Sequence, residues 1–149
     1  MEIKNSEGGR PRQKKQEYKS QIDDLISKIT NGHKEFDFEV YFSEVFHEKK
    51  GFDVVIANPP YVGFHGIDRK FKHQLQQIYV SADGKFDLYL PFIERSYALL
   101  AIKGFFVFIC PTAFTKRDHG KRLRQFLRNN VCIRELVDFE HDQMFDGAT

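Results

Sequence analysis

The residues best suited to chemistry form one short stretch, Asn58-Pro59-Pro60-Tyr61, which directly follows an apolar run. Asn58 and Pro59 each precede a proline, so their backbones are biased toward extended conformations, and the proline rings remove two N–H donors. The Asn58 side-chain oxygen and the Pro59 carbonyl can therefore accept hydrogen bonds from one ligand amine, while the Tyr61 ring lies over a flat partner. The stretch predicts a site for a planar aromatic amine.

Such an amine is a poor nucleophile because its lone pair is delocalised into the ring. Two acceptors on its hydrogens favour the pyramidal, more nucleophilic geometry that attack requires. This chemistry needs no lysine, histidine or metal ion. The spacing of His65, His73 and His119 matches no metal site or triad, which predicts surface or loop roles. Cys110 and Cys132 lie in apolar segments, which predicts small core residues rather than a disulfide, a zinc site or a catalytic thiol.

The elements that must position this stretch follow the pattern of a parallel α/β sheet. The apolar runs at residues 52–57 and 105–110 predict strands covered on both faces, and residues 131–139 predict a third strand. Helices predicted between the strands give right-handed crossovers. Ligands of an open parallel sheet bind beyond the carboxyl ends of its strands, which is where Asn58 follows the first run.

The first crossover helix is predicted over residues 88–100, with Asp87 as its cap, Pro91 in its first turn and Gly104 at its close. The second crossover helix carries an apolar stripe formed by Leu123, Phe126 and Leu127. Before the first of these helices, residues 63–85 are polar and contain three glycines, which predicts a long functional or mobile loop.

The start of the chain has a different character. Residues 1–20 are basic and poor in apolar positions, which predicts a loose segment. A short amphipathic helix follows and ends at Asn31-Gly32. Its apolar positions are Tyr18, Ile22, Leu25, Ile26 and Ile29. Alternating apolar and polar residues at 36–42 then predict a half-buried strand at an edge or flap.

The composition is that of one globular domain. The 149 residues include 23 Lys+Arg against 21 Asp+Glu, which argues against a wholly basic nucleic-acid tail. Hydrophobic residues make up 41% of the chain and 16 positions are Phe, too much apolar material for a disordered protein. The longest apolar run is too short to cross a bilayer, and the N-terminus lacks the apolar core of a secretory signal. We expect a cytoplasmic protein with no membrane partner.

Cations cluster between residues 116 and 128, where Asp118 is the single acid. The candidates for contact with a nucleic-acid backbone are Lys116, Arg117, Lys121 and Arg124. A solvated outer helix face is the alternative, since charged residues normally occupy that side of a helix.

The chain resembles the second half of the catalytic domain of adenine-specific DNA methyltransferases, in particular type II restriction-modification enzymes that fuse methylation and cleavage. The resemblance runs from about Phe36 to the last residue. It rests on four stretches in order: FDVVIANPPYV, KFDLYLPFIERSYALL, GFFVFICPTAF and LVDFEHDQMFDGAT. It implies an α/β fold that is part of the Rossmann-like methyltransferase sheet, S-adenosylmethionine as methyl donor, and double-stranded DNA as partner.

The resemblance also implies roles for single residues. Asn58 and Pro59 of the Asn-Pro-Pro-Tyr motif would hold the amino group of an adenine flipped out of the duplex. Tyr61 would stack on this base, and Phe145 would pack against it as a second aromatic residue. Phe92 would border the adenosine of the methyl donor. Ordinary core packing remains the alternative for Phe145 and Phe92.

Two features of that family are not found in the sequence: the glycine-rich turn that holds the donor and the acidic residue that follows it. We therefore expect residues 1–35 to form a basic segment and a helix. Residues 36–149 are expected to form the second half of a methyltransferase catalytic domain, without the donor-binding half and the target-recognition domain. Such a chain would be inactive without the remainder of its parent enzyme.

Two other functions remain compatible with the residues. The Asn-Pro-Pro-Tyr motif is shared by enzymes that methylate adenine in RNA or glutamine amides in proteins. A non-catalytic nucleic-acid-binding piece also fits, because the glycine-rich turn is missing. By resemblance, the long glycine-containing loop at residues 63–85 and the DLYLPFIERS block favour the first interpretation, a fragment of a site-specific DNA adenine methyltransferase that uses no metal.

Overall fold

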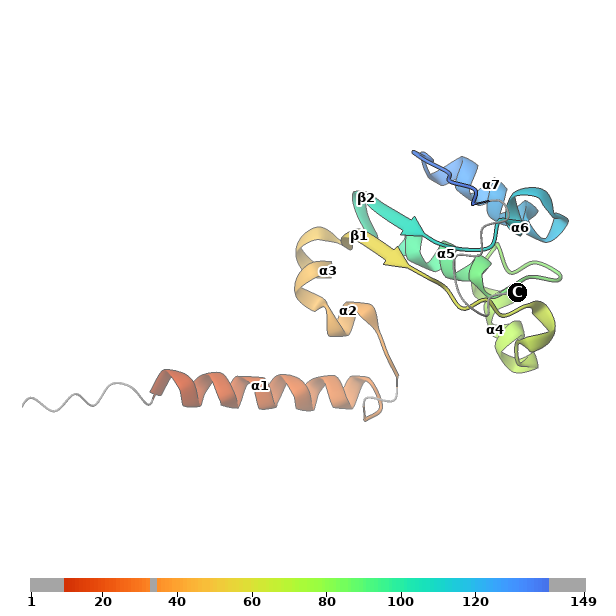
Figure 1. The fold of residues 1–149 in the computed structure, drawn as a ribbon. Coiled ribbons are helices and arrows are strands. Elements are labelled where there is room, and N and C mark those ends of the chain that lie inside the picture. The colour runs from red at the N-terminus through yellow and green to blue at the C-terminus, as the bar shows by residue number, and fades with distance from the viewer. Residues whose placement is uncertain (1–9, 33–34, 140–149) are drawn as a thin grey trace, which may run out of the picture. The chain divides into compact units, whose positions relative to one another are not determined.

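The computed structural model describes residues 10–32 and 35–139, and the chain divides into two compact units (Figure 1). The first unit is Met1–Lys50 and the second is Gly51–Thr149. Among the described residues, none of the helices combines the length and the apolar character of a membrane-spanning segment.

The first unit begins with a long helix, α1 (Arg10–Ile29). The prediction of a loose segment through residue 20 is wrong over residues 10–20, because these are mostly Lys, Arg, Gln and Glu, which favour helix. Pro11 does not interrupt the helix because it lies in the first turn. Asn31 (φ 50°) and Gly32 (φ 70°) follow the helix in the left-handed conformation, as predicted.

The strand predicted at residues 36–42 is wrong, since this segment forms the short helix α2 (Phe38–Tyr41). The Asp37 carboxylate accepts hydrogen bonds from the N–H groups of Glu39 at 2.8 Å and Val40 at 3.4 Å. This cap satisfies donors that a strand would present to a neighbour. The Phe36 and Tyr41 rings stack at 4.8 Å, whereas on a strand these two residues, five positions apart, would point to opposite faces. Helix α3 (Ser43–Lys49) completes the unit.

The second unit is built on two parallel strands, β1 (Phe52–Ala57) and β2 (Leu100–Phe108), which confirms the parallel sheet and its first two strands. Strand β2 starts earlier than predicted. The register steps from Phe52 opposite Leu100 to Val54 opposite Phe105, so β2 carries extra residues here. Gly104 lies in this irregular stretch and does not close a helix. A Cβ at Gly104 would lie 2.9 Å from the Phe52 carbonyl oxygen, which explains the glycine.

One face of the sheet packs against the core and the other is uncovered by described residues. Phe106 and Phe108 pack against the buried cluster, whereas four side chains on the opposite face are 54–77% exposed. These four pair directly across the strands, as Val54 with Phe105 and Ile56 with Val107. The predicted coverage of both faces is therefore wrong within the described chain, because no described helix packs over this second face.

Both helices predicted after the strands are confirmed, as α5 (Tyr89–Ala98), which connects β1 to β2, and α7 (Lys121–Asn130), which follows β2. Pro91 lies in the first turn of α5, as predicted, but Asp87 does not cap the helix, because the N-cap is Leu88 and makes no side-chain bond. In α7 the stripe residues Leu123 and Leu127 are buried. Nine buried apolar residues of this unit form one core: Ile67, Leu75, Ala82, Phe86, Tyr89, Leu90, Ile93, Leu123 and Leu127.

The loop predicted at residues 63–85 is wrong, because this stretch contains the 3-10 turn η1 (Phe64–Gly66) and helix α4 (Arg69–Ile78). The Asp68 carboxylate caps α4 by accepting from the N–H groups of Lys70 at 2.9 Å and Phe71 at 3.1 Å. The connection between β2 and α7 also carries short elements, α6 (Ala113–Lys116) and η2 (Asp118–Gly120).

The third predicted strand, residues 131–139, is not a strand in the structure. Residues from Cys132 onward in this segment are exposed, so the prediction of a buried Cys132 is also wrong. A strand is stabilised by a hydrogen-bonding neighbour, and the sheet of the described residues is limited to β1 and β2. The apolar pattern alone does not hold this segment in the sheet.

Candidate active site

The Asn58-Pro59-Pro60-Tyr61 stretch leaves the carboxyl end of β1 and forms a corner at the edge of the sheet. Asn58 and Pro60 are exposed, whereas Pro59 is fully buried. Asn58 therefore offers its side-chain acceptor to solvent, whereas Pro59 is enclosed by its surroundings.

The Tyr61 ring is held beside the end of the second strand. Its hydroxyl donates a hydrogen bond to the main-chain carbonyl of Ile109 at 3.2 Å, while 43% of the residue remains exposed. Ile109 in turn donates its N–H to the Ala57 carbonyl at 3.3 Å, which extends the sheet by one bond. A ring fixed at one end and open on its surface can support a flat ligand.

Burial raises the pKa of Cys110, which follows Ile109, to about 11. The pKa of the Tyr61 phenol is also raised, first by burial and then by the neighbouring Cys110. Both groups thus keep their protons at neutral pH. Tyr61 acts as a hydrogen-bond donor here, and a half-buried protonated thiol is a poor nucleophile.

The chain after Tyr61 is attached to the start of α5. The Leu88 N–H donates to the Val62 carbonyl at 2.9 Å, and a Cβ at Gly63 would lie 3.5 Å from an Asp87 carboxylate oxygen. The other Asp87 oxygen lies 3.6 Å from Nε2 of His119 in η2. These contacts join the corner, α5 and the segment leading to α7.

Of the surface or loop role predicted for His119, the loop position is confirmed, since His119 lies in the connection between β2 and α7, but the surface position is wrong. Its side chain is 20% exposed, and Nε2 is buried without a hydrogen bond to any described residue. His65 and His73 are exposed, as predicted. Within the part of the chain that the structure describes, no three His, Cys, Asp or Glu side chains form a group that could hold a metal ion.

Phe92 lies on α5, where its neighbours Pro91 and Ile93 are buried and Phe92 itself is 43% exposed. Its ring is therefore partly free to contact a ligand, unlike a residue of the core. Phe145, the second aromatic residue predicted for the base, lies outside the described residues.

Some of the cations at residues 116–128 bind other groups of the fold, and others are exposed to solvent. The Arg124 guanidinium donates to the carbonyls of Phe114 at 2.5 Å and Arg117 at 2.8 Å, so it fixes the turn before α7. Arg122 pairs with Asp83 at 2.7 Å. The side chains of Lys116, Arg117 and Lys121 are exposed and remain candidates for phosphate contact.

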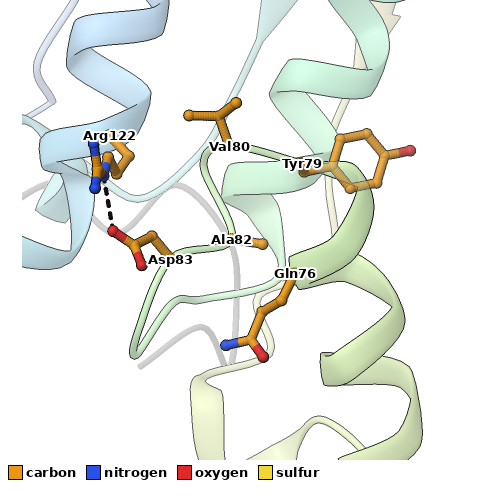
Figure 2. A pocket seen from close by; sticks show the side chains of 6 residues that line it. All are labelled: Gln76, Tyr79, Val80, Ala82, Asp83 and Arg122. Atoms are coloured by element: carbon orange, nitrogen blue, oxygen red, sulfur yellow. Dashed lines mark hydrogen bonds and ion pairs between the residues drawn. The ribbon is translucent and has the colours of Figure 1, made fainter.

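A separate open cavity of about 350 Å³ lies between α4, the following loop and α7 (Figure 2). Figure 2 shows the Arg122–Asp83 ion pair at one side of it. The lining residues are Gln76, Tyr79, Val80, Ala82, Asp83 and Arg122. The cavity was not predictable from the sequence, because Arg122 is far from the other lining residues along the chain. On the core side, the Glu94 carboxylate shapes the loop by accepting from the N–H groups of Val80 and Ser81 at 3.0 and 2.8 Å.

Comparison with known proteins places the chain in a family. A model of the Eco57I restriction-modification methylase family matches residues 3–145, which is nearly the whole chain. The chain belongs to this family. Its parallel strands with crossover helices are accordingly part of a Rossmann-like methyltransferase fold, as predicted.

Individual relatives of this Eco57I-family chain include type II enzymes from several bacteria. RM.Eco57I of Escherichia coli, a type II restriction enzyme and methyltransferase, is 38% identical over 101 residues, which are 66% of this chain and 10% of the relative. The type II methyltransferase M.BstVI of Geobacillus stearothermophilus is 37% identical over 96 residues, 64% of this chain and 17% of the relative. M.HincII of Haemophilus influenzae is 28% identical over 106 residues, 69% of this chain and 21% of the relative. The chain thus matches about a tenth to a fifth of the length of these relatives.

Proposed function

We propose that this chain is the part of a site-specific DNA adenine methyltransferase that receives the flipped target base. The observation that carries the proposal is the corner itself. Asn58 follows β1 directly, and Tyr61 is tied to Ile109 at the same edge of the sheet. Membership of a restriction-modification methylase family supports a methyl-transfer reaction on DNA, with duplex DNA as the partner.

The chemistry follows from two acceptors on one amine. The Asn58 side-chain oxygen and the Pro59 carbonyl would bind the two amino hydrogens of adenine, which concentrates the lone pair on nitrogen. This nitrogen would form the new bond to the methyl carbon while the carbon–sulfur bond of the sulfonium breaks and the thioether leaves, and the methylated nitrogen would then lose one proton to water. S-adenosylmethionine, when bound, supplies the methyl group. Exposed Asn58 would meet the base first, and Tyr61 would stack on its face.

For the methyl donor, this chain supplies one candidate contact, the ring of Phe92. A ring that is 43% exposed beside buried neighbours fits a flat adenosine. The uncovered sheet face of Val54, Ile56, Phe105 and Val107 supports the proposal that a further half of the domain packs here, because parallel sheets are normally covered on both faces. That half would carry the glycine-rich turn and the acidic residue.

For DNA, the exposed Lys116, Arg117 and Lys121 are the proposed phosphate contacts. Arg124, which binds two carbonyls, would shape this segment rather than reach a phosphate. Modification of the cell's own DNA would take place in the cytoplasm.

A methyl-transfer assay tests this function. The chain is coexpressed with RM.Eco57I from which the homologous region has been deleted, and both the complex and the chain alone receive S-adenosylmethionine with a labelled methyl group. We expect label in adenine of duplex DNA from the complex and none from the chain alone. Transfer to RNA or to protein glutamine, with DNA unlabelled, would contradict the proposal and favour the corresponding alternative.

A further inference from the structure

Helix α1, the first helix in Figure 1, carries four exposed apolar residues at regular spacing, Tyr18, Ile22, Leu25 and Ile29. The spacing of four, three and four residues places these side chains on one face of the helix, where they form an apolar stripe. Each of them is 56–65% exposed. Single exposed apolar residues are ordinary, but four large ones in a row are typical of a surface that binds another molecule.

The charges beside this stripe are of one sign. With about 100° of rotation per residue, the stripe is bordered by Lys14, Lys15, Lys19 and Lys28, all within roughly 90° of its centre. The acids Glu17, Asp23 and Asp24 lie further round, about 110–130° from the centre. The binding face of α1 is therefore apolar along its middle and positive along both margins.

These margins argue against a second copy of the chain as the partner. In a parallel or antiparallel pair of α1 helices, lysines would face lysines on both sides of the seam. The stripe also spans about two heptads, short of the three to four that a coiled coil needs. Nucleic acid is a poor candidate for the partner as well, because a phosphate backbone has no apolar surface against which four large apolar side chains could be buried.

We propose that α1 docks on a protein surface with an apolar groove bordered by carboxylates, and that the remainder of the methyltransferase domain provides this surface. The groove is expected to be bordered by carboxylates because the lysines beside the stripe are positively charged. The family match begins at residue 3, so α1 lies inside the region that the family shares, which favours a protein of the same enzyme over a lipid surface. Naming the rest of the enzyme as partner depends on the proposed function, whereas the chemistry of the groove does not.

The test measures binding rather than methyl transfer. The full 149-residue chain is coexpressed with RM.Eco57I lacking its homologous region, and the affinity of the purified pair is measured by titration. Ile22→Asp places a charge in the stripe and should weaken binding at least tenfold. Ser20→Asp adds the same charge to the opposite side of the same helix and should change binding less than twofold. Lys19→Glu keeps the stripe and should weaken binding, with a smaller salt dependence than the unchanged chain.

The docking proposal would be overturned if the unchanged chain did not bind, or if Ile22→Asp and Ser20→Asp weakened binding equally. It would also be overturned if the chain alone formed a dimer in sedimentation that Ile22→Asp abolished. Flotation of the chain with phosphatidylglycerol vesicles that Ile22→Asp abolished would favour a lipid surface instead. Circular dichroism of each variant, compared with that of the unchanged chain, checks that the helix content is the same. Binding that persists while methyl transfer fails would leave docking supported and the proposed function contradicted, so the two failures can be told apart.

Discussion

The hydroxyl of Tyr61 donates a hydrogen bond to the carbonyl of Ile109, 48 positions further along the chain, at 3.2 Å. This bond joins the corner after β1 to the residue that follows the end of β2. It restricts the Tyr61 ring while leaving 43% of the residue exposed. A ring that is anchored before a ligand arrives loses little conformational freedom on binding.

Tyr61→Phe should lower the free energy of unfolding by about 1 kcal/mol or less, because it removes one partly exposed hydrogen bond and keeps the ring. Chemical denaturation of the chain measures this loss. Tyr18→Phe, at a residue that is 61% exposed on α1, is the control for removal of a phenol hydroxyl. A loss well above 2 kcal/mol would mean that the hydroxyl does more than anchor the ring.

The same position separates stacking from hydrogen bonding toward the target base. Tyr61→Phe should bind a flipped base nearly as well as Tyr61 does, whereas Tyr61→Ala should lose about 1–3 kcal/mol of base binding. Fluorescence of 2-aminopurine at the target position of a duplex, with the complete enzyme, reports this difference. Equal binding by the Phe and Ala variants would rule out a stacking role.

Two cations of the basic segment should behave in opposite ways. Arg124→Ala removes the donor to the Phe114 and Arg117 carbonyls and should cost about 1–3 kcal/mol of stability. Lys121→Ala should leave stability nearly unchanged and reduce the slope of log affinity for duplex DNA against log salt by about 0.9. Thermal unfolding and salt-dependent DNA titration measure the two effects. If Lys121→Ala leaves the salt slope unchanged, Lys121 contacts no phosphate.

The raised pKa of Cys110 predicts that the folded chain loses stability at alkaline pH. Its pKa is raised to about 11 in the folded chain from an ordinary value of 9.0, so the folded state holds the thiol proton more tightly than the unfolded state. Its contribution is complete below pH 9 and is lost as the pH rises from 9 through 11. Unfolding by urea at each pH measures this loss. Between pH 9 and 11 the free energy of unfolding should fall less in Cys110→Ala than in the unchanged chain. Cys132→Ala, at an exposed position, is the control, and an identical pH dependence in both variants would contradict the assignment.

Local patterns were sufficient to predict the elements that carry the site. Strand β1 and helix α7 were predictable because an apolar run is a local signal of a strand and an apolar stripe is a local signal of a helix, although the run of β1 did not predict that one face of the sheet is exposed. The prediction failed at residues 36–42, where the Asp37 cap selects a helix despite strand-like alternation. It failed again at residues 131–139, where an apolar pattern has no neighbouring strand among the described residues.

Some features of the candidate site were also predictable from local sequence and others were not. The Asn58–Tyr61 corner was predictable because proline geometry is local and its place after an apolar strand is visible in the sequence. The bond from Tyr61 to Ile109 and the approach of His119 to Asp87 were not, because each joins residues brought together by the fold. Arg124 was predicted as a phosphate contact from its charge, and its two carbonyl partners emerge in the folded turn.

If the Asn58 side-chain oxygen acts on the reacting amine, Asn58→Ala removes the acceptor on which the reaction depends. In the complete enzyme, single-turnover methylation of duplex DNA should slow on the order of 100-fold or more, while DNA affinity stays within about twofold, because the lost acceptor acts at the reacting nitrogen. Asn130→Ala, at an exposed position at the end of α7, is the matched control and should methylate at the normal rate. Unchanged single-turnover methylation by Asn58→Ala would contradict the account.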